Sequence, residues 1–275
     1  MKLDPYINFS ELKLNYKNSI SPRGKVALVT GGTGRIGSIF VSIFLLNDFK
    51  VIIASRLKKK FKQFSNSLPQ QYRKNLYWVK LDLLKPDLSV KQIKKLNKKF
   101  EIDYLVNNAA SHYRGKNIDY TSKNIQKEFF GLIGTSILIT EEVLKNMRKR
   151  KNGNIINVGS IWGISAPKFD TYLEMDIAPS LMTSICKAGM SHFSKYLTAR
   201  ESGYNININT LSPGWFPRKG KKSRNDYMKM ITKDIPQKRI GNLTDLVSVI
   251  NFLISTGSKY FTGQTVKIDG GHSVW

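Results

Sequence analysis

Four glycines between positions 31 and 37 follow a short apolar run and mark the stretch of this chain best suited to bind a ligand. The run Val26–Thr30 is rich in β-branched residues, which is typical of a buried strand in a parallel sheet. Apolar residues then recur from Ser38 to Leu46, as in a helix packed on such a sheet. A glycine turn between strand and helix presents backbone N–H groups and a positive helix end to an anion. Lys25–Gly37 therefore predicts a phosphate-binding loop; the alternative is a glycine turn that holds no ligand.

A second candidate binding residue, Arg56, follows the next expected strand, Val51–Ala54. In a dinucleotide-binding fold the end of this strand faces the adenosine ribose. An acidic residue there would bind the 2′-hydroxyl of NAD, whereas an arginine suits the 2′-phosphate of NADP. Arg56 therefore favours NADP and makes NAD the less expected cofactor; the alternative is an ordinary surface arginine.

Several other kinds of site find no support in the sequence. A single cysteine, Cys186, excludes an internal disulfide and a cysteine metal cluster. The histidines at positions 112, 192 and 272 show no ligand spacing, so we predict no metal site. No apolar run is long enough to span a bilayer and no signal-peptide core is visible, so we expect a cytoplasmic protein without membrane insertion.

The chain is strongly basic, with 45 Lys plus Arg against 19 Asp plus Glu and a formal charge of +26. One interpretation is a protein that binds nucleic acid or an anionic surface. The basic clusters are spread along the chain, which favours lysines scattered over solvated helix faces: Lys58–Lys62, Lys91–Lys99, Lys145–Lys151 and Arg218–Arg224. We therefore predict no specific nucleic-acid partner, but a preference for small anionic ligands such as phosphates.

The elements that must position these residues alternate along the chain. Further strands are expected at 76–81, 104–106, 155–158, 204–212 and 266–268, and helical segments at 57–75, 90–100, 122–150 and 244–253, the last capped by Thr244. Strands that alternate with helices form βαβ units with right-handed crossovers. The pattern predicts an α/β fold with one Rossmann-like, doubly wound parallel sheet flanked by helices, an α/β/α sandwich. Residues 1–23 would form an N-terminal arm, and residues 24–275 the domain.

Short motifs in a fixed order give the chain a resemblance to the short-chain dehydrogenase/reductase family. They are TGGTGRIG at Thr30–Gly37, Asp82 after the third strand, NNAA at Asn107–Ala110, SPG at Ser212–Gly214 and TGQTVKIDGG at Thr262–Gly271. The resemblance covers about Lys25 to Gly271. It implies hydride transfer between a nicotinamide cofactor and a carbonyl or alcohol.

The resemblance also implies a set of cofactor contacts. Asp82 would contact adenine, Asn107 would support the sheet beside the cofactor, and Pro213-Gly214 would lie by the nicotinamide. Arg35 stands where the family usually has glycine; as in similar pteridine-reductase-like members, it would meet a cofactor phosphate, unless it points to solvent. The expected cofactor-binding residues are Thr30, Gly31, Thr33, Gly34, Arg35, Ile36, Gly37, Arg56, Asp82, Leu83, Asn108, Ala109, Lys187, Pro213, Gly214 and Trp215.

The catalytic residues that the resemblance implies are only partly present. The family uses a serine that binds the substrate oxygen, a tyrosine four residues before a lysine as the general acid, and an asparagine that supports a relay water. Ser160 and Lys187 match the serine and the lysine. Thr183 stands at the tyrosine position, one helical turn before Lys187 and on the same face, and Gly131 stands at the asparagine position. An aliphatic hydroxyl is a far weaker acid than a phenol, so Thr183 cannot simply replace the tyrosine.

Tyr172 is the other candidate for the acid. It lies in an inserted segment after Ser160 and could point into the active site. It lacks the spacing of the family, since the residue four places on is Asp176. The alternative is a tyrosine with a structural role or a contact to substrate.

A narrower resemblance spans Gly159 to Gly214. The segment GSIWGISAPKFDTYLEMD is similar to members of the family in bacterial surface-polysaccharide and flagellin-glycan biosynthesis, which implies a sugar-like substrate and a substrate lid at about 214–240. The sequence thus predicts an NADP-dependent oxidoreductase in surface-glycan biosynthesis, working as a homo-dimer or homo-tetramer. The alternative is a pseudoenzyme that keeps the cofactor loop and serves as a cofactor-binding partner of an active homologue.

Overall fold

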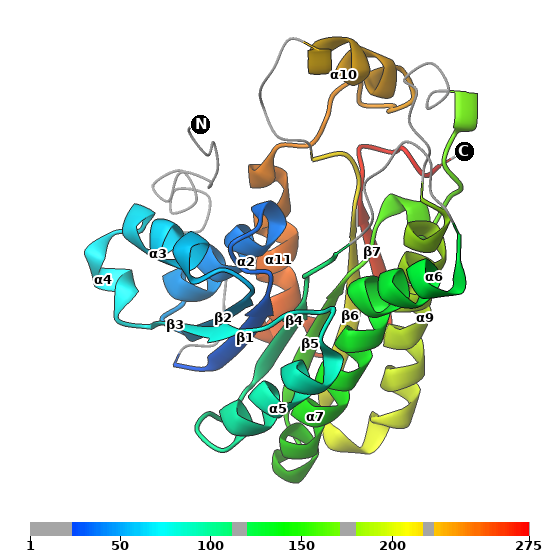
Figure 1. The fold of residues 1–275 in the computed structure, drawn as a ribbon. Coiled ribbons are helices and arrows are strands. Elements are labelled where there is room, and N and C mark those ends of the chain that lie inside the picture. Colours follow the sequence, from blue (N-terminus) through cyan, green and yellow to red (C-terminus); the bar gives the residue numbers. More distant parts are fainter. Residues whose placement is uncertain (1–23, 112–119, 171–179, 217–222, 275) are drawn as a thin grey trace.

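The computed structural model describes residues 24–111, 120–170, 180–216 and 223–274. Within these residues the strands form a seven-stranded, wholly parallel sheet in the order β3-β2-β1-β4-β5-β6-β7 (Figure 1). The strands are β1 (Val26–Thr30), β2 (Lys50–Ser55), β3 (Leu76–Lys80), β4 (Tyr104–Asn107), β5 (Gly153–Val158), β6 (Ile206–Pro213) and β7 (Thr265–Ile268). The predicted α/β class and doubly wound parallel sheet are confirmed.

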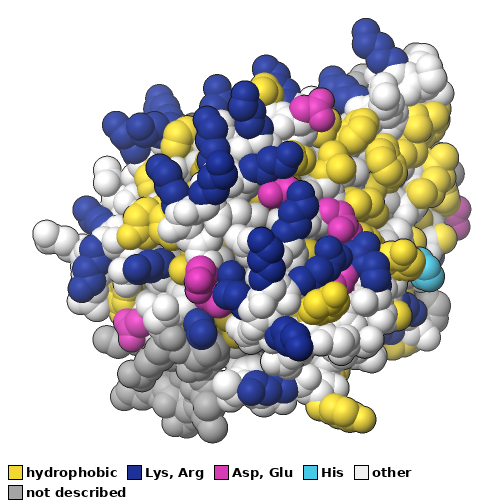
Figure 2. Space-filling view, turned by 90° about the horizontal axis from the view of Figure 1, so that it is seen from below, with side chains coloured by type: hydrophobic (Ala, Val, Ile, Leu, Met, Phe, Trp, Pro, Cys, Tyr) yellow, Lys and Arg dark blue, Asp and Glu magenta, His cyan; other side chains and the backbone are white. Residues whose placement is uncertain are grey.

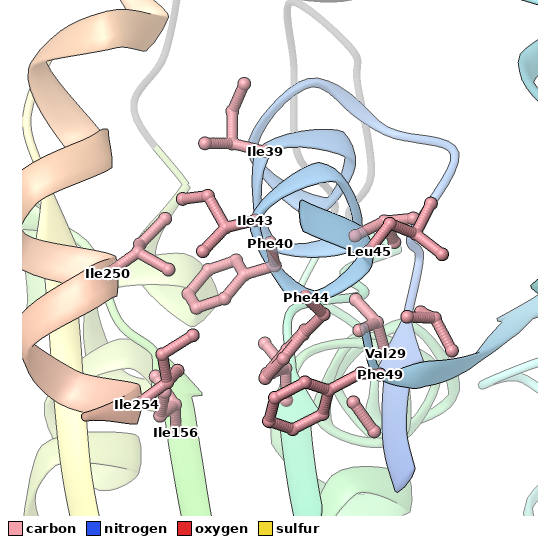
Figure 3. Packing of buried hydrophobic residues seen from close by; sticks show 14 of the residues in the cluster. Val29, Ile39, Phe40, Ile43, Phe44, Leu45, Phe49, Ile156, Ile250 and Ile254 are labelled. Carbon is pink, nitrogen blue, oxygen red and sulfur yellow. The ribbon is translucent and has the colours of Figure 1, made fainter. Parts of the chain in front are cut away.

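Helices cover both faces of the sheet (Figure 1). On one face, α2 (Arg35–Leu46) and α11 (Val247–Ile254) bury a cluster that includes Phe40, Phe44 and Ile250 (Figure 3). On the other face, α5 (Pro86–Asn97), α7 (Thr135–Arg150) and α9 (Leu181–Arg200) bury Ile93, Val143 and Leu197. The other α-helices of the described residues are α3 (Lys58–Ser67), α4 (Gln70–Arg73), α6 (Ser122–Phe129) and α10 (Ser223–Lys233). No helix in the described ranges is both long and apolar enough to cross a bilayer.

Three aromatic rings pack together between α2, the sheet and α11. The ring of Phe44 lies 5.0 Å from that of Phe49 and 5.6 Å from that of Tyr104, centroid to centroid. The Tyr104 hydroxyl donates a hydrogen bond of 3.0 Å to the carbonyl of Ile254 at the end of α11. The C-terminal part of the helix that follows the glycine loop is therefore packed against a residue of β4 that is bonded to α11.

Two expected helices differ from the sequence prediction. The segment 57–75 divides into α3 and α4 because Pro69 forces Leu68 into an extended conformation with ψ of 150°. The segment 122–150 is helical throughout, but α6 and α7 are joined by a π-helical turn, η1 (Phe130–Gly134). Such turns insert one residue into a helix and recur at functional sites.

Thr244 does not cap the helical segment that ends in α11, so that prediction was wrong. Asn242 is the cap of a 3₁₀ turn, η4 (Leu243–Leu246), that leads into α11. The carboxylate of Asp245 accepts from the N–H of Asn242 at 2.8 Å, which completes a reciprocal capping box. The predicted arm, residues 1–23, lies outside the described residues.

Candidate cofactor site and active site

The glycine loop lies where the strand order reverses direction. β2 and β4 flank β1 on opposite sides, which opens a crevice between the loops after β1 and β4 at the carboxyl edge of the sheet. The buried Thr30 hydroxyl donates to the carbonyl of Val106 at 3.1 Å and accepts from the N–H groups of Asn108 and Ala109 at 3.0 Å. The Asn108 amide donates back to the carbonyls of Thr30 and Gly31. The Thr30 side chain thus links the two loops, and its hydroxyl forms its hydrogen bonds within the protein.

The glycines of this loop are sterically required. A Cβ atom on Gly37 would lie 2.4 Å from the carbonyl oxygen of Gly31 and 2.7 Å from the amide nitrogen of Asn108. Gly31 itself has a positive φ of 65°. The helix α2 begins at the half-buried Arg35 with no side-chain cap and no acidic residue in its first turn. Its first N–H groups can therefore serve an anionic ligand, and the loop fits the pyrophosphate of a dinucleotide.

A pocket of about 690 Å³ opens where the chain leaves β2 and β3. It brings together two expected cofactor contacts, Arg56 and Asp82, and adds two lysines that were not expected there, Lys80 and Lys85. Both lysines are close in sequence to Asp82, and this proximity is the feature from which their place in the pocket could have been predicted. The Asp82 carboxylate accepts from the N–H of Leu84 at 3.1 Å, which orients it. With three basic groups and one acid, the pocket favours an anionic ligand.

Leu83 is placed as part of the protein interior. Its side chain is 5% exposed and belongs to the core on the α5 and α7 face. Its carbonyl accepts a hydrogen bond of 2.6 Å from the Thr135 hydroxyl at the start of α7. Leu83 therefore ties the loop after β3 to α7.

Ser160 directly follows Gly159 at the end of β5. The glycines before and after it in the sequence, Gly159 and Gly163, pack closely against neighbouring elements. The Ser160 hydroxyl accepts from the N–H of Trp162 at 3.2 Å and caps a 3₁₀ turn, η2 (Ile161–Gly163). A Cβ on Gly159 would lie 2.4 Å from the Ser212 hydroxyl on β6, and one on Gly163 would lie 2.4 Å from the carbonyl carbon of Lys187 on α9. The serine-bearing segment is thus pressed against both β6 and α9.

Lys187 is a buried cation next to this segment. Its side chain crosses from α9 to the last residue of β5, where the ammonium donates to the carbonyl of Val158 at 2.6 Å. Burial lowers the pKa of Lys187 from 10.5 to about 8, and the neighbouring Cys186 acts in the opposite direction. Thr183 is half-buried one turn earlier, and its N–H donates to the hydroxyl of Ser180, the cap of α9.

Gly131, at the position of the family's asparagine, has no space for a side chain. It lies in η1, and a Cβ there would stand within clash distance of the carbonyl oxygen of Ser111. The Gly131 carbonyl accepts from the N–H of Ser111 at 2.8 Å, so backbone contacts occupy both sides of this glycine. An asparagine side chain cannot stand here unless the loop after β4 moves.

A chain of buried hydrogen bonds fixes α9 relative to the sheet. The Asn107 amide donates to Thr140 on α7 and to Asn157 on β5, each at 2.8 Å. Asn157 donates to Ser194 on α9 at 2.8 Å, and the Ser194 hydroxyl lies 2.7 Å from that of Thr210 on β6. The position of Lys187 therefore depends on polar contacts that cross three strands.

The remaining candidates lie at the start of the expected lid or outside the described residues. The rings of Trp215 and Trp162 meet edge to face at 6.0 Å, and the N–H of Gly214 donates to the carbonyl of Ile268 at 2.8 Å. Tyr172 and residues 217–222 of the expected lid lie outside the described residues. A pocket of about 360 Å³ beside β7 is lined in part by residues of the expected lid; its lining is Trp215, Phe216, Ile235, Gln237, Arg239, Gly241, Asp245, Lys267, Ile268, Asp269, Gly270 and Gly271. No group of three His, Cys, Asp or Glu side chains with metal-binding geometry occurs in the described part of the chain.

Comparison with known proteins places this chain among oxidoreductases. The sequence profile of the family described as enoyl-(acyl carrier protein) reductase matches residues 35–273. The chain is 31% identical over 254 residues to post-translational flagellin modification protein A of Campylobacter coli, covering 90% of this chain and 97% of that protein. It is 27% identical over 249 residues to the 3-oxoacyl-[acyl-carrier-protein] reductase of Chlamydia trachomatis, covering 90% and 96%.

Two solved structures at similar identity carry bound cofactors. A short chain dehydrogenase from Leptospira borgpetersenii with bound NAD+ is 27% identical, with a TM-score of 0.78 over 99% of this chain and 98% of that one. ElxO with NADP bound is 26% identical, with a TM-score of 0.79 over 92% and 100%. The two relatives hold different cofactors, so similarity alone does not choose between NAD and NADP for this chain.

Proposed function

The chain belongs to the short-chain dehydrogenase/reductase family, and on that basis we propose that it is an NADP-dependent oxidoreductase that interconverts a carbonyl and an alcohol. The observation that carries the proposal is the arrangement of the carboxyl edge of the sheet. The phosphate-binding loop follows β1 there, and Ser160 follows β5 at the same edge, with Lys187 bound to the end of β5.

Different residues at this edge would bind the cofactor and bind the reacting substrate. The loop Gly31–Gly37 and the start of α2 would hold the pyrophosphate, and Asp82 the adenine. When bound, the dihydronicotinamide supplies a hydride for the carbonyl carbon. The Ser160 hydroxyl would bind and orient the substrate oxygen, and the Trp162–Trp215 pair would help to keep water from it.

The preference for NADP is supported by charge. Arg56, Lys80 and Lys85 converge on the pocket expected to take the adenosine ribose, and a 2′-phosphate would pair with them. Arg56→Ala should weaken NADPH binding about tenfold and leave NADH binding unchanged, because only NADPH carries that phosphate. Fluorescence titration measures both affinities. The control is Lys62→Ala on the exposed side of α3, which removes a positive charge outside the pocket. Equal NADPH and NADH affinities in the wild type would refute the NADP preference.

A sugar-like substrate in surface-glycan biosynthesis is supported by two observations. The Gly159–Gly214 segment resembles that branch of the family, and the relative from C. coli is a flagellin modification protein. The pocket beside β7 combines two aromatic rings with Arg239 and Asp269, a mixture suited to a polyhydroxylated ligand. NADPH oxidation with a panel of keto sugars and nucleotide-linked keto sugars tests this proposal, with 3-oxoacyl thioesters as the competing class.

A pseudoenzyme that serves as a cofactor-binding partner is the second candidate, favoured by two specific observations. Thr183 replaces the family's acid, and the Ser111 carbonyl fills the place of the relay asparagine beside Gly131. A wild-type protein that binds NADPH but turns over no carbonyl, combined with turnover by Thr183→Tyr, would establish that candidate. Turnover by the wild type would dismiss it.

A further inference from the structure

We propose that the Lys187 ammonium is the proton donor of this site, and that the Thr183 hydroxyl passes the proton to the substrate oxygen. The inference rests on the proposed oxidoreductase function. It assigns the acid to a residue that elsewhere in the family assists a tyrosine, because this chain has no tyrosine one turn before its lysine.

The geometry provides a held and shielded donor. The Lys187 side chain is 7% exposed, and its ammonium is fixed at 2.6 Å from the Val158 carbonyl, two residues before Ser160. Gly163 packs against the Lys187 backbone so closely that a Cβ would lie 2.4 Å from its carbonyl carbon. Thr183 precedes Lys187 by one turn on the same helix face. In this structure the Lys187 ammonium donates to the Val158 carbonyl and no hydrogen bond joins it to the Thr183 hydroxyl, so the transfer requires the ammonium to turn from Val158 toward Thr183.

Among the described residues, the elements packed around Lys187 contain little to stabilise its charge. The elements η2, β5, β6 and η1 that pack on α9 carry no charged side chain. On α9 itself the neighbouring titratable group is Cys186, and from α6 the buried Glu128 faces that thiol. Burial therefore dominates and lowers the pKa of Lys187 to about 8. A buried ammonium of this kind can release its proton near neutral pH.

A threonine hydroxyl is suited to relay this proton although it is too weak to supply one. It can accept one hydrogen bond while donating another, so it passes a proton without a lasting change of charge. In the reductive direction a hydride adds to the carbonyl carbon with its electron pair, and an O–H bond forms from the Thr183 hydroxyl. The hydroxyl takes a proton from Lys187 as that N–H bond breaks. The neutral amine then regains a proton from water, and in the oxidative direction it accepts one.

The first test measures the lysine without turnover. Lysine Nζ and Cε resonances are followed by NMR from pH 6 to 11, and the Lys187 signal is assigned by its loss in Lys187→Met. The expected midpoint is about 8. A Lys187 signal that titrates only above about pH 10, like an ordinary lysine, would overturn the inference whatever the enzyme turns over.

The second test uses steady-state reduction by the wild type and matched variants. We expect kcat to fall tenfold per pH unit above about pH 8 in the wild type, since only the ammonium donates. Thr183→Val, which keeps the shape without the hydroxyl, should lose about 10²-fold in kcat, and Thr183→Ser should keep most of it. Lys187→Arg should bind NADPH and lose turnover, because a guanidinium keeps its proton. Lys195→Met, an exposed lysine two turns further along α9, should leave the profile unchanged.

The outcomes separate the two proposals. Turnover with a kcat that is independent of pH, or that survives Thr183→Val, would overturn the relay and leave the oxidoreductase function standing. A Lys187 midpoint near 8 and tight NADPH binding, with no turnover of any carbonyl by the wild type, would instead overturn the oxidoreductase function.

Discussion

Lys187 is a single residue whose buried positive charge lowers the stability of the folded chain. Its pKa in the folded chain, about 8, is below the ordinary 10.5, so between these values the unfolded chain binds a proton that the folded chain lacks. Stability contributed by this group therefore rises with pH across that window. Below pH 8 the buried ammonium costs up to about 3 kcal/mol.

The first prediction follows from that cost. Lys187→Met should raise the free energy of unfolding by about 2 kcal/mol at pH 6, because the penalty disappears while the bond to Val158 is lost. Most of the gain should be gone by about pH 10.5, where the wild-type amine is neutral in the folded chain and about half protonated in the unfolded chain. Urea unfolding at the two pH values measures it, with the exposed Lys195→Met as the control. A gain that does not change with pH would contradict the assigned burial penalty.

Gly37 gives the second prediction at this scale. Gly37→Ala places a Cβ 2.4 Å from the Gly31 carbonyl, which must shift, so we expect a loss of about 1–3 kcal/mol in stability and weaker NADPH binding. The matched control is Gly203→Ala, where an added Cβ meets no atom within 4 Å. Chemical denaturation and fluorescence titration report the two effects. An unchanged NADPH affinity would show that the loop does not hold the cofactor.

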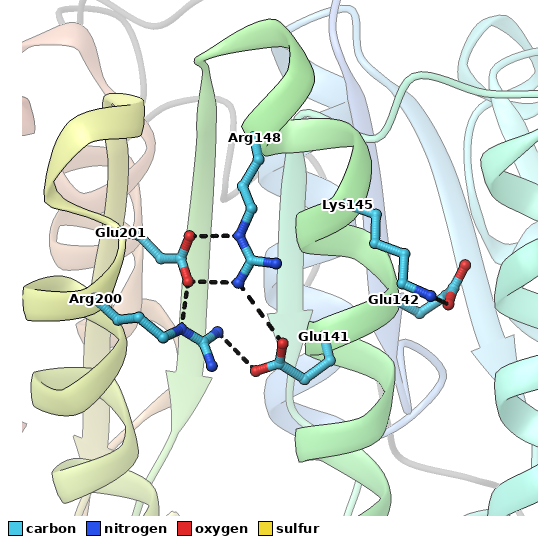
Figure 4. A network of polar contacts seen from close by, with 6 residues as sticks. All are labelled: Glu141, Glu142, Lys145, Arg148, Arg200 and Glu201. Carbon is cyan, nitrogen blue, oxygen red and sulfur yellow. Dashed lines mark hydrogen bonds and ion pairs between the residues drawn. The ribbon is translucent and has the colours of Figure 1, made fainter.

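At the scale of elements, the ends of α7 and α9 are joined by a network of charged groups (Figure 4). The Glu201 carboxylate has 1% exposure and accepts from Arg148 through two nitrogens at 2.7 Å and from Arg200 at 2.6 Å. Arg200 also binds Glu141, 2.7 Å away on α7. The hydrogen bonds from Arg148 come first among the causes that hold the pKa of Glu201 below its usual value.

Glu201→Gln should therefore destabilise the fold by about 3 kcal/mol, because two arginines lose the buried charge that they share. The wild type should lose this contribution as the pH falls through the lowered pKa of Glu201, and the variant should lack that acid-sensitive step. Urea unfolding from pH 3 to 7 tests both. The control is Lys145→Met on α7, whose pair with Glu142 is 58% exposed on the lysine side and contributes at most about 1 kcal/mol. Equal losses in the two variants would refute a special role for the Glu201 network.

At the scale of the whole molecule, basic and apolar side chains occupy different parts of the surface. Figure 2 shows Lys and Arg spread across the face seen from below, with the largest group of apolar side chains toward the side where Figure 1 has α6 and α9. Exposed apolar residues on α6, α7 and α9 include Ile125, Phe129, Leu138, Leu181, Ile185 and Tyr196. The spread of the lysines agrees with a solvated surface, and the apolar residues support the proposed homo-oligomer.

The fourth prediction tests that assembly. The double variant Leu138→Glu/Ile185→Glu should shift the protein from a dimer or tetramer to a monomer, because it places charges on two residues that are 38% and 54% exposed. Light scattering after size-exclusion chromatography measures the mass. Leu57→Glu, at a 53% exposed apolar residue before α3, is the control. A wild-type monomer would refute the proposed oligomer, and an unchanged variant would place its interface elsewhere.

The sequence by itself determined the class of fold and the edge of the sheet that carries the site. Period and composition identified the strands, because buried parallel strands are continuous apolar runs, and the glycines at 31–37 marked a turn that only glycine can make. Where the prediction failed, as with Thr244, a second polar residue two positions earlier could also have capped the turn, and the reciprocal bonds of Asn242 decided it.

The tertiary structure decided what each site residue can do. Lys187 is titratable near neutral pH only because η2, β5 and α9 close around it, and Gly131 excludes an asparagine only because the loop after β4 lies against it. Lys80 and Lys85 join Arg56 only because β2 and β3 end side by side. Sequence patterns report backbone geometry and periodicity, which are local. Burial and the meeting of distant segments depend on packing, and these set the charge and the chemistry of the site.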